Sequence, residues 1–443
     1  MEKELPIGWV EIELGNILKL KNGYAFKSDD FKDTGIPVIR ISNIQNELVQ
    51  TENAARVDQS KIKQEFVVQQ GDILIAMSGA TTGKYGIYNE EVVALQNQRV
   101  GNLIPHDESL TSRKFILYLL GGLKKEIEEK AYGGAQPNIS PKLIEEIRIG
   151  LPPLPEQQRI VAKLDTLFGH LDALKTRLDR IPQLLKDFRQ KVLTQAVTGK
   201  LTEEWREGRE LEEWEESPLK EFSTSRLGKM LDKEKNQGIP TKYLRNINVR
   251  WFDFDLDDLF EIKVSEEEMQ KYSIQDRDVL VCEGGEPGRA AIWRNGNTNI
   301  IFQKALHRVR LNNNILPEFF LYNLKVDSVN NVLSSLFTGT TIKHLTGVAF
   351  SDYSINIPPL EEQQEIVRRV ESLFAKADQI EASYQKLKAK IEQLPQALLA
   401  KAFRGELVEQ LPTDGDARDL LEQIKLAKEG LEKGGKSILR KTK

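Results

Sequence analysis

A stretch of eighteen residues occurs twice in this chain, 206 positions apart. Residues 151–168 read LPPLPEQQRIVAKLDTLF, residues 357–374 read IPPLEEQQEIVRRVESLF, and ten of the eighteen positions are identical. The offset holds without a gap as far as Leu201 and Leu407, and both copies close on a glycine followed two residues later by leucine. Identity at this level over a fixed offset indicates an internal duplication, so we expect a fold with two equivalent halves.

Within each copy, apolar residues alternate at spacings of four and three. This pattern averages 3.5 residues, which keeps one side of a helix facing a partner helix. These positions, named the seam below, are Ile160, Leu164, Leu167, Leu171, Leu174, Leu178, Ile181, Leu185, Phe188 and Val192 in the first copy, and Ile366, Val370, Leu373, Ala377, Ile380, Tyr384, Leu387, Ile391, Leu394 and Leu398 in the second. Each copy therefore predicts a helix of about forty residues, roughly 60 Å long. Because the stripes match in length and phase, we expect them to pack on each other; packing of each on its neighbouring module is the alternative.

The ends of both helices carry typical signals. Prolines and a glutamate that the helix dipole favours mark the beginnings: Pro155, Glu156, Pro358, Pro359 and Glu362. Gly199 and Gly405 suit the ends. Pro182 and Pro395 fall inside the pattern, where proline predicts a kink.

The regions outside the helices repeat more faintly. The corresponding segments are Gly35–Ile44 with Gly238–Ile247, Gly71–Tyr88 with Arg277–Trp293, Gln96–Val100 with Phe302–Leu306, and Tyr132–Ser140 with Thr338–Thr346. They mix short β-branched strands and Gly-rich turns with helices such as Arg113–Lys130. The fold class expected is α+β: two pseudo-repeated mixed α/β modules joined by two long helices.

The expected division of the chain follows from this order. It comprises a first module (1–150), a long helix (151–201), an acidic linker (202–218), a second module (219–356), a second long helix (357–408) and a C-terminal tail (409–443). Residues 203–217 carry eight Glu against two Arg and suit a solvated connector. An imitation of phosphate, or a face for a basic partner, is the alternative. The tail predicts a short amphipathic helix, Asp419–Leu431, before a basic run.

Composition excludes several classes of protein. A single cysteine, Cys282, rules out an internal disulfide framework, and four scattered histidines do not suggest a zinc site. No signal peptide or membrane helix is recognisable, so the expected location is the cytoplasm. The net charge of -4 does not argue for nucleic acid, but it does not exclude a local basic face.

No motif for catalysis is present. SGATTGKY (Ser78–Tyr85) resembles a phosphate-binding loop, but only three residues separate its glycines and Tyr85 replaces the Ser or Thr that would hold magnesium. Glu261–Lys263 reads better as an acidic turn leading into a strand than as a nuclease site. His170, His307 and His344 lack a Ser or Cys partner in any motif. We therefore predict that this chain is not an enzyme and holds no metal.

Two related modules separated by a fixed helical pair suit an extended, roughly two-fold target, and duplex DNA is such a target. The sequence L-P-P-L-x-E-Q-Q-x-I-V, followed by a long heptad helix and present twice between dissimilar modules, resembles the specificity (S) subunits of type I restriction-modification enzymes. The resemblance covers Leu5 to about Leu407, nearly the whole chain.

The resemblance implies a function and partners. Each module would be a target recognition domain that reads one half of a bipartite site in double-stranded DNA. The helices would form an antiparallel coiled coil that sets the gap between the halves. Two methyltransferase (M) subunits would dock on the pseudo-symmetric body and methylate adenines, and restriction/translocase (R) subunits could join them. S-adenosylmethionine, Mg and ATP would then be bound by the partner subunits, with no cofactor in this chain.

The resemblance does not identify the base-contacting residues. Polar and basic side chains on turns are the physical candidates. In the first module these are Arg40, Asn43, Ser78, Lys84, Gln98, Arg99, Gln136 and Asn138; in the second they are Arg245, Asn246, Arg289, Lys304, Thr340, Thr341, Lys343 and His344. For each of them an ordinary surface or turn role is the alternative.

Three other functions stay open from sequence. A coiled-coil scaffold whose modules bind proteins would produce no methylation pattern. A fused enzyme would carry specificity and methyltransferase on one chain, although modules and helices already account for the length. An orphan specificity subunit would lack a neighbouring methyltransferase reading frame.

Overall fold

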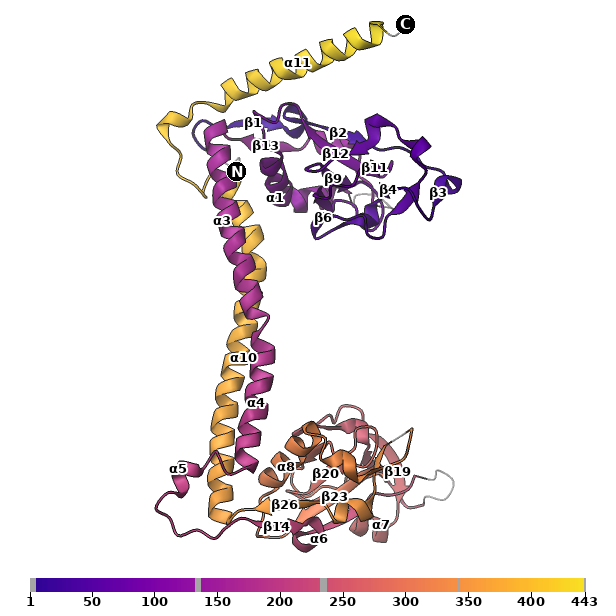
Figure 1. Ribbon diagram of the computed structural model, residues 1–443, viewed down its shortest axis with the longest axis vertical. Helices are drawn as coiled ribbons and strands as arrows, with labels where there is room; N and C mark the ends of the chain where they lie inside the picture. The colour runs from indigo at the N-terminus through magenta and orange to yellow at the C-terminus, as the bar shows by residue number, and fades with distance from the viewer. Residues whose placement is uncertain (1–4, 132–136, 232–236, 342, 442–443) are drawn as a thin grey trace. The chain divides into compact units, whose positions relative to one another are not determined.

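A computed structural model describes residues 5–131, 137–231, 237–341 and 343–441, with side chains described as far as Gly430. The chain divides into two compact units (Figure 1). The first comprises Met1–Arg177 with Leu387–Lys443, and the second comprises Leu178–Lys386. Each unit thus holds one module and parts of both long helices, as the duplication predicts.

The first module is built on two sheets. One has six strands in the order β2 (Leu18–Asn22), β12 (Val100–Pro105), β9 (Ile73–Ala76), β10 (Tyr85–Tyr88), β6 (Glu47–Val49), β5 (Ile44–Gln45). The other runs β3 (Phe31–Lys32), β7 (Ala55–Val57), β4 (Ile36–Ile39), β11 (Ala94–Gln96), β8 (Val67–Val68). Strand β2 alternates buried leucines with more exposed lysines, whereas β9 is apolar throughout and completely buried.

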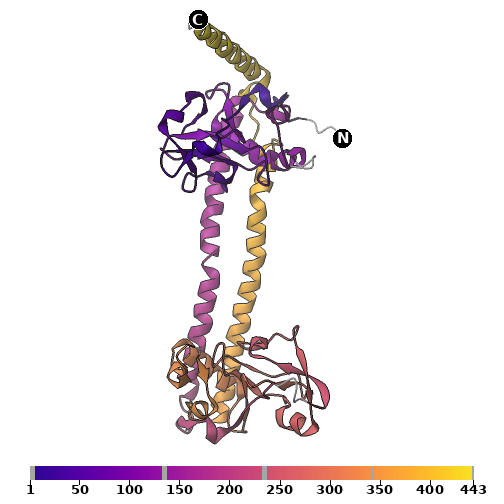
Figure 2. The ribbon, with the colours of Figure 1, turned by 90° about the vertical axis from the view of Figure 1, so that its right-hand side faces the viewer.

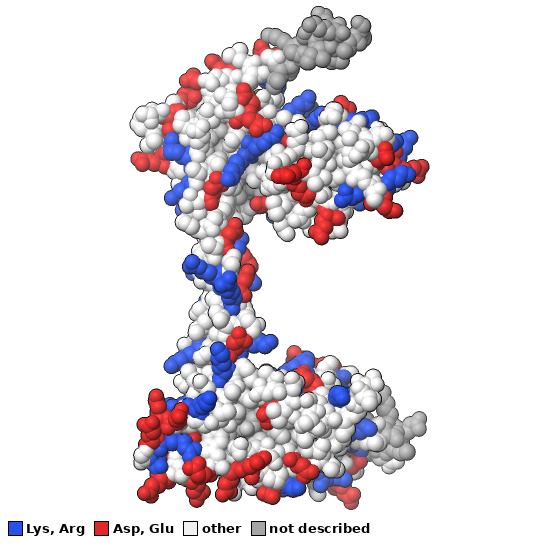
Figure 3. All heavy atoms as spheres, viewed as in Figure 1, with Lys and Arg blue, Asp and Glu red and all other residues white. Residues whose placement is uncertain are grey.

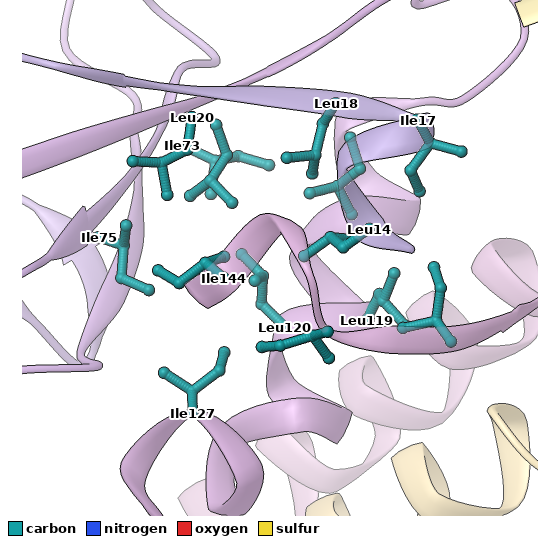
Figure 4. Close-up of a cluster of buried hydrophobic side chains, with 14 of the residues drawn as sticks. Leu14, Ile17, Leu18, Leu20, Ile73, Ile75, Leu119, Leu120, Ile127 and Ile144 are labelled. Carbon is teal, nitrogen blue, oxygen red and sulfur yellow. The ribbon is translucent and has the colours of Figure 1, made fainter. Parts of the chain in front are cut away.

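Two helices cover the six-stranded sheet of the first module. They are α1 (Arg113–Ala131) and the short α2 (Pro141–Glu145). Figure 4 shows leucine and isoleucine side chains from β2, β9, α1 and α2 that meet in one buried cluster. Helix α1 matches the predicted segment 113–130.

The second module repeats this plan with fewer strands. One sheet runs β15 (Ser223–Leu227), β23 (Leu306–Leu311), β20 (Val279–Cys282), β21 (Ala290–Ile292), and another runs β19 (Phe260–Val264), β16 (Ile239–Leu244), β22 (Ile301–Phe302). Helix α8 (Pro317–Val329) covers the first of these, and α7 (Glu266–Tyr272) follows β19. The segment 261–263 lies within strand β19, so the acidic turn that was predicted to lead into a strand is the preceding segment, 255–259.

The strands confirm the faint sequence repeat and correct its register at one place. Strands β9 and β10 correspond to β20 and β21, as expected. Beyond β4, however, Asn43 accepts a hydrogen bond from the Arg40 amide just as Asn248 accepts one from the Arg245 amide. The structural counterpart of Asn43 is therefore Asn248 and not Asn246, because β16 is two residues longer than β4.

The first long helix is interrupted, which corrects the prediction of one continuous helix. Helix α3 (Leu154–Leu178) is separated from α4 (Ile181–Val197) by two residues, and Pro182 lies in the first turn of α4. Proline is tolerated there because the first turn needs no amide donor. Helix α10 (Leu360–Ala402) contains Pro395 without a break. Gly199 and Gly405 follow these helices with φ of +76° and +71°.

The long helices pair in antiparallel fashion within each unit (Figure 2). In the first unit, Ile160 and Leu164 near the start of α3 pack with Leu399 near the end of α10. In the second, Val192 near the end of α4 packs in one cluster with Ile366 near the start of α10. The predicted intramolecular pairing is thus confirmed.

Burial divides the seam into two sets. Ile160 and Ile366 are buried at the beginnings of the helices, and beyond them one residue per heptad is buried: Leu164, Leu171, Leu178, Leu185 and Val192 in the first copy, and Val370, Ala377, Tyr384 and Ile391 in the second. The alternate positions are partly open, with Leu174 44%, Phe188 38%, Ile380 52%, Leu387 47% and Leu394 40% exposed. A pair of helices covers only part of a stripe that a larger bundle would enclose.

All eight glutamates of the acidic linker are exposed, as predicted for a solvated connector, and the linker is also anchored within the second unit. Trp214 packs edge-on against Phe319, with ring centroids 5.9 Å apart, and donates a hydrogen bond to Glu362. It is followed directly by strand β14 (Glu215–Pro218), which pairs with β26 (Ser354–Ile357). The linker therefore joins the second module to the start of α10.

The tail forms helix α11 (Ala417–Lys441), which is longer than the predicted 419–431. Its Leu420 and Ile424 are buried in the core of the first module. Arg159 of α3 holds Asp414, just before this helix, through two contacts of 2.6 Å. None of the helices in the described parts of the chain is long and apolar enough to cross a membrane.

Candidate nucleic-acid interface

Three loops of the first module meet at the end of strand β9. Met77 donates its amide to the Arg99 carbonyl at 2.9 Å, and Ile139 donates its amide to the Met77 carbonyl at 2.9 Å. Ser78 and Asn138 form an isolated β-bridge. Strand β9 thus brings together loops that are far apart in sequence, and we name this place the first corner.

The first corner is a shallow hollow of about 770 Å³. Four of its lining residues were predicted from sequence, namely Ser78, Gln98, Arg99 and Asn138. Gln98, Arg99 and Asn138 are exposed, while the Ser78 hydroxyl is buried and has no hydrogen-bond partner among the described residues. Arginine pairs with guanine, and asparagine and glutamine pair with adenine, so this set can read base edges.

Three further candidates of the first module, Arg40, Asn43 and Lys84, do not line the first corner. Arg40 is exposed with its guanidinium 5.7 Å from the centre of the Phe31 ring, and Lys84 is exposed. Asn43 is buried, and its side chain also donates to the Gln50 carbonyl at 3.1 Å, so the fold itself accounts for this residue. Gln136 lies outside the described residues.

The second module has an equivalent place, which we name the second corner. Glu283 donates its amide to the Ala305 carbonyl at 2.9 Å, and Leu345 donates its amide to the Glu283 carbonyl at 2.8 Å. Gly284 and His344 form an isolated bridge, 206 residues after Ser78 and Asn138. Lys304 takes the place of Gln98 in the duplicated sequence.

The polar side chains of the second corner are more strongly paired. His344 lies 3.1 Å from the Glu283 carboxylate, and Arg289 contacts Glu286 at 2.7 Å. The Asn246 side chain donates to the Gly284 carbonyl at 3.2 Å, which ties the loop after β16 to this corner. The two corners therefore share a backbone frame but present different chemistry.

Arg245 is also paired, whereas four other candidates of the second module are exposed. Arg245 contacts Asp258 at 2.6 Å and lies 3.8 Å from the centre of the Phe260 ring. The exposed residues are Lys304, Thr340, Thr341 and Lys343. Within the described parts of the chain, neither Lys304 nor Lys343 forms an ion pair. On the face shown in Figure 3, basic and acidic side chains are interspersed over both modules.

Two contributors to the corners were missed from sequence. Asn22, the last residue of β2, lines the first corner, and Glu283 contacts His344 in the second. Glu283 lies at the end of a predicted strand, at the same offset as Met77, so the repeat itself could have indicated it.

Cys282 and His307 of the second module are both buried, which suits a structural role. Burial raises the pKa of the Cys282 thiol to about 11, which opposes formation of a thiolate. Burial lowers the pKa of His307, whose Nε2 lies 2.6 Å from the Leu345 carbonyl oxygen. Among the described residues, no group of three His, Cys, Asp or Glu side chains could hold a metal ion.

Comparison with known proteins gives concordant matches. The model of the type I restriction modification DNA specificity domain matches residues 6–183 and again residues 211–393. The chain is 32% identical to the type I restriction enzyme EcoKI specificity subunit of Escherichia coli K12, and 30% identical to the StySPI specificity subunit of Salmonella potsdam; each alignment covers 99% of both chains.

Solved structures share the fold. The HsdS subunit from Thermoanaerobacter tengcongensis superposes with a TM-score of 0.63 at 18% identity, covering 92% of this chain and 99% of that one. A chain from a structural study of complex assembly in a type I R-M system gives a TM-score of 0.62 at 19% identity, covering 91% of this chain and 100% of that one.

Proposed function

Since this chain belongs to the family of type I restriction-modification DNA specificity proteins, we propose that each module reads one half of a bipartite site in double-stranded DNA. The chain is the specificity subunit of such a system, and DNA recognition is divided between its two domains. Sequence is read by polar contacts to base edges, so each corner would supply the side chains for one half-site.

The observation that carries this proposal is the pair of equivalent corners with different side chains. The same backbone bridge joins Ser78 to Asn138 and Gly284 to His344. Where the first corner exposes Gln98 and Arg99, the second has Lys304 and Ala305. A conserved frame with exchanged side chains suits two half-sites of unrelated sequence. We leave Asn43 out of the contact surface, since its side chain is engaged within the fold.

We further propose that two methyltransferase subunits dock on the long helices. Support comes from the partly open half of the seam, because apolar side chains in a helical stripe are normally covered. Additional helices packed along Leu174 and Leu394 in one unit, and along Phe188 and Ile380 in the other, would complete a bundle. The partners would bring S-adenosylmethionine and methylate adenine at N6, and R subunits would bring ATP and Mg.

Single-molecule methylation sequencing of the host genome, with and without this gene, tests the function. We expect a split motif of two short half-sites to lose N6-methyladenine when the gene is deleted. Transfer of the second module's corner residues from a relative should change only one half of the motif. An unchanged methylome would contradict the function and favour an orphan subunit or a protein scaffold, and co-purification with the products of neighbouring genes would then separate these two.

A further inference from the structure

A second hollow lies in the second unit. Helices α4 and α8 lie side by side there (Figure 1). The hollow between them has a volume of about 610 Å³. Its floor is apolar and is formed by Leu193, Ile292, Leu321 and Phe374. This size is typical of a cleft that receives a compact group. We name it the α4–α8 cleft.

The polar lining of the α4–α8 cleft has more donors than acceptors. Lys186 and Lys325 line it, and neither forms an ion pair within the described residues. The Gln190 side-chain nitrogen, also in the lining, is buried and has no hydrogen-bond partner among the described residues. Buried donors without acceptors are uncommon in folded proteins, so this set favours an incoming anionic group.

Asp187 also lines the cleft, where it accepts a hydrogen bond from Gln183 at 2.7 Å and forms no ion pair with either lysine among the described residues. The Lys325 ammonium lies 4.4 Å from the centre of the Trp251 ring and is partly buried in α8. Burial lowers the pKa of Lys325, and the nearby charge of Lys186 lowers it further while Glu286 opposes this. The other cations of the lining are neutralised, since Arg294 contacts Glu318 and Arg189 contacts Asp378. A carboxylate in the cleft would relieve the unfavourable proximity of Lys186 and Lys325.

The equivalent place in the first unit is filled. The segment FILYLL (115–120) of α1 corresponds to FFLYNL (319–324) of α8, so Gly121 stands where α8 has Lys325. A Cβ on Gly121 would lie 2.7 Å from Leu399 and 2.9 Å from the Tyr85 hydroxyl. By the 206-residue offset, Glu392 takes the place of Lys186. Both cations and the free space are therefore particular to the second unit.

The α4–α8 cleft also opens at the surface with an apolar lip. Phe252 and Val329 line it and remain 39% and 47% exposed. Phe252 is held with a φ of +70°, an uncommon conformation for an aromatic residue. An apolar lip around a cationic interior fits a protein segment that presents an apolar side chain next to a carboxylate.

We propose that the α4–α8 cleft receives an apolar side chain and a neighbouring Asp or Glu from a helix of the docked methyltransferase subunit. This rests on the proposed docking function and adds that only the second module offers such an anchor. The carboxylate accepts hydrogen bonds from Lys186, Lys325 and Gln190, and the apolar side chain packs against the floor. One of the two partner copies is therefore held by contacts that the other lacks.

Native mass spectrometry of the full chain titrated with the methyltransferase subunit encoded beside it tests this. The variant combines Lys186→Glu with Lys325→Glu. Its matched control, Lys242→Glu with Lys263→Glu, makes the same charge change at exposed positions of β16 and β19. We expect the first pair to weaken binding of one partner copy at least tenfold and leave the other copy unchanged, and the control pair to bind like the wild type.

Amine-reactive labelling provides a second readout. Lys325 and Lys186 should lose reactivity when the complex forms, while Lys242 should keep it. Unchanged binding by the cleft variant, or full reactivity of Lys325 in the complex, would overturn this inference and leave docking itself intact. A wild-type chain that binds no methyltransferase subunit would overturn the docking function together with the inference.

Discussion

The indole nitrogen of Trp9 donates a hydrogen bond to the buried carboxylate of Glu156 at 2.9 Å, at the start of α3. Trp214 makes the same 2.9 Å contact with Glu362 at the start of α10. In both places the next residue, Gln157 or Gln363, donates to a proline carbonyl at 2.9 Å. The repeated sequence thus fixes the beginning of each long helix to the residue, Trp9 or Trp214, that directly precedes a strand, Val10–Glu13 or Glu215–Pro218.

Replacement of Trp9 should cost more stability than replacement of Trp214. Glu362 also accepts from Thr202 at 2.7 Å and from Arg206 at 2.8 Å, so it keeps donors when its indole is lost. We expect Trp9→Phe to lower the free energy of unfolding by about 1–2 kcal/mol, since a buried acceptor loses its partner. Urea denaturation followed by circular dichroism compares Trp9→Phe with Trp214→Phe. An equal or larger loss in Trp214→Phe would contradict this account.

The stability of the first unit should also depend on the ionisation of Glu156. Burial raises the pKa of this carboxyl above its usual value of 4.5, against the hydrogen bond from Trp9. A raised folded-state pKa means that its stabilising contribution is present below about pH 4.5 and is lost as pH rises through the folded-state value. Glu156→Gln mimics the protonated form, so its advantage over the wild type should grow as the pH rises above 4.5.

Denaturation midpoints of Glu156→Gln and the wild type between pH 4 and 8 measure this difference. Glu204→Gln, at an exposed position of the linker, is the matched control and should show no such trend. A constant difference between Glu156→Gln and the wild type across the range would mean that the carboxyl does not titrate abnormally.

Much of the architecture follows from sequence because a duplication makes each half a test of the other. The offset of 206 locates both long helices, and it relates the strand at residues 73–76 to that at residues 279–282. The same offset pairs Ser78–Asn138 with Gly284–His344, so once one corner is known the other can be located from the sequence. Polar residues on turns that repeat at a fixed offset indicate equivalent sites in the two modules, because the backbone around them repeats as well.

Other features depend on contacts that a sequence pattern does not contain. A heptad pattern gives the phase of a seam but not the number of helices around it, so the exposure of Leu174 was not predicted. Trp9 and Trp214 are related by 205 residues, not 206, within otherwise different sequences. The pairing of His344 with Glu283 joins residues 61 positions apart, which local spacing does not indicate.

Two glycines that the modules share should not tolerate a side chain. A Cβ on Gly23 would lie 2.3 Å from the Gln96 carbonyl oxygen, and one on Gly228 would lie 2.3 Å from the Phe302 carbonyl oxygen. Backbone atoms cannot move away as the end of a side chain can, so Gly23→Ala and Gly228→Ala should each destabilise the chain by about 3 kcal/mol or more.

Gly169, inside α3, is the matched control for these glycines. A Cβ there meets nothing within 4 Å. Gly169→Ala should therefore stabilise the chain by about 0.5–1 kcal/mol, as alanine is the better helix former. Thermal denaturation of the three variants measures all these changes. A stable Gly23→Ala protein would show that the first corner has a looser backbone than described.

Substitutions in the two corners should affect different halves of the DNA site. Arg99→Ala removes an exposed guanidinium from the first corner, and Lys304→Ala removes an exposed ammonium from the second. If these groups contact base edges, each loss should cost about 1–3 kcal/mol of discrimination at one half-site. Methylation of oligonucleotides with single base changes, by the complex assembled with its methyltransferase subunits, measures this.

Thr340→Ala and Lys343→Ala test the rest of the exposed loop in the second module. Both should affect the same half-site as Lys304→Ala. By contrast, Arg245→Ala should act first on stability, because its guanidinium already contacts Asp258 and the Phe260 ring. Equal loss at both half-sites from any single corner variant would contradict the division of recognition between modules.

Substitutions of the buried seam residues should affect folding, and substitutions of the exposed seam residues should affect docking. Leu171 is 6% exposed and Leu174 is 44% exposed, although both belong to the same heptad stripe of α3. Leu171→Ala should lower the free energy of unfolding by about 2–4 kcal/mol, as expected for a buried leucine. Leu174→Ser should change it by less than about 1 kcal/mol because the side chain is already partly in water.

Binding of the methyltransferase subunit should instead depend more on the exposed seam residues than on the buried ones. Leu174→Ser combined with Leu387→Ser and Leu394→Ser places hydroxyls on the open stripe of the first unit, where a docked helix would have to bury them. We expect this triple variant to fold like the wild type and to lose one partner copy in native mass spectrometry. If it binds both copies normally, the open stripe is not the docking surface, and the partner must contact the modules instead.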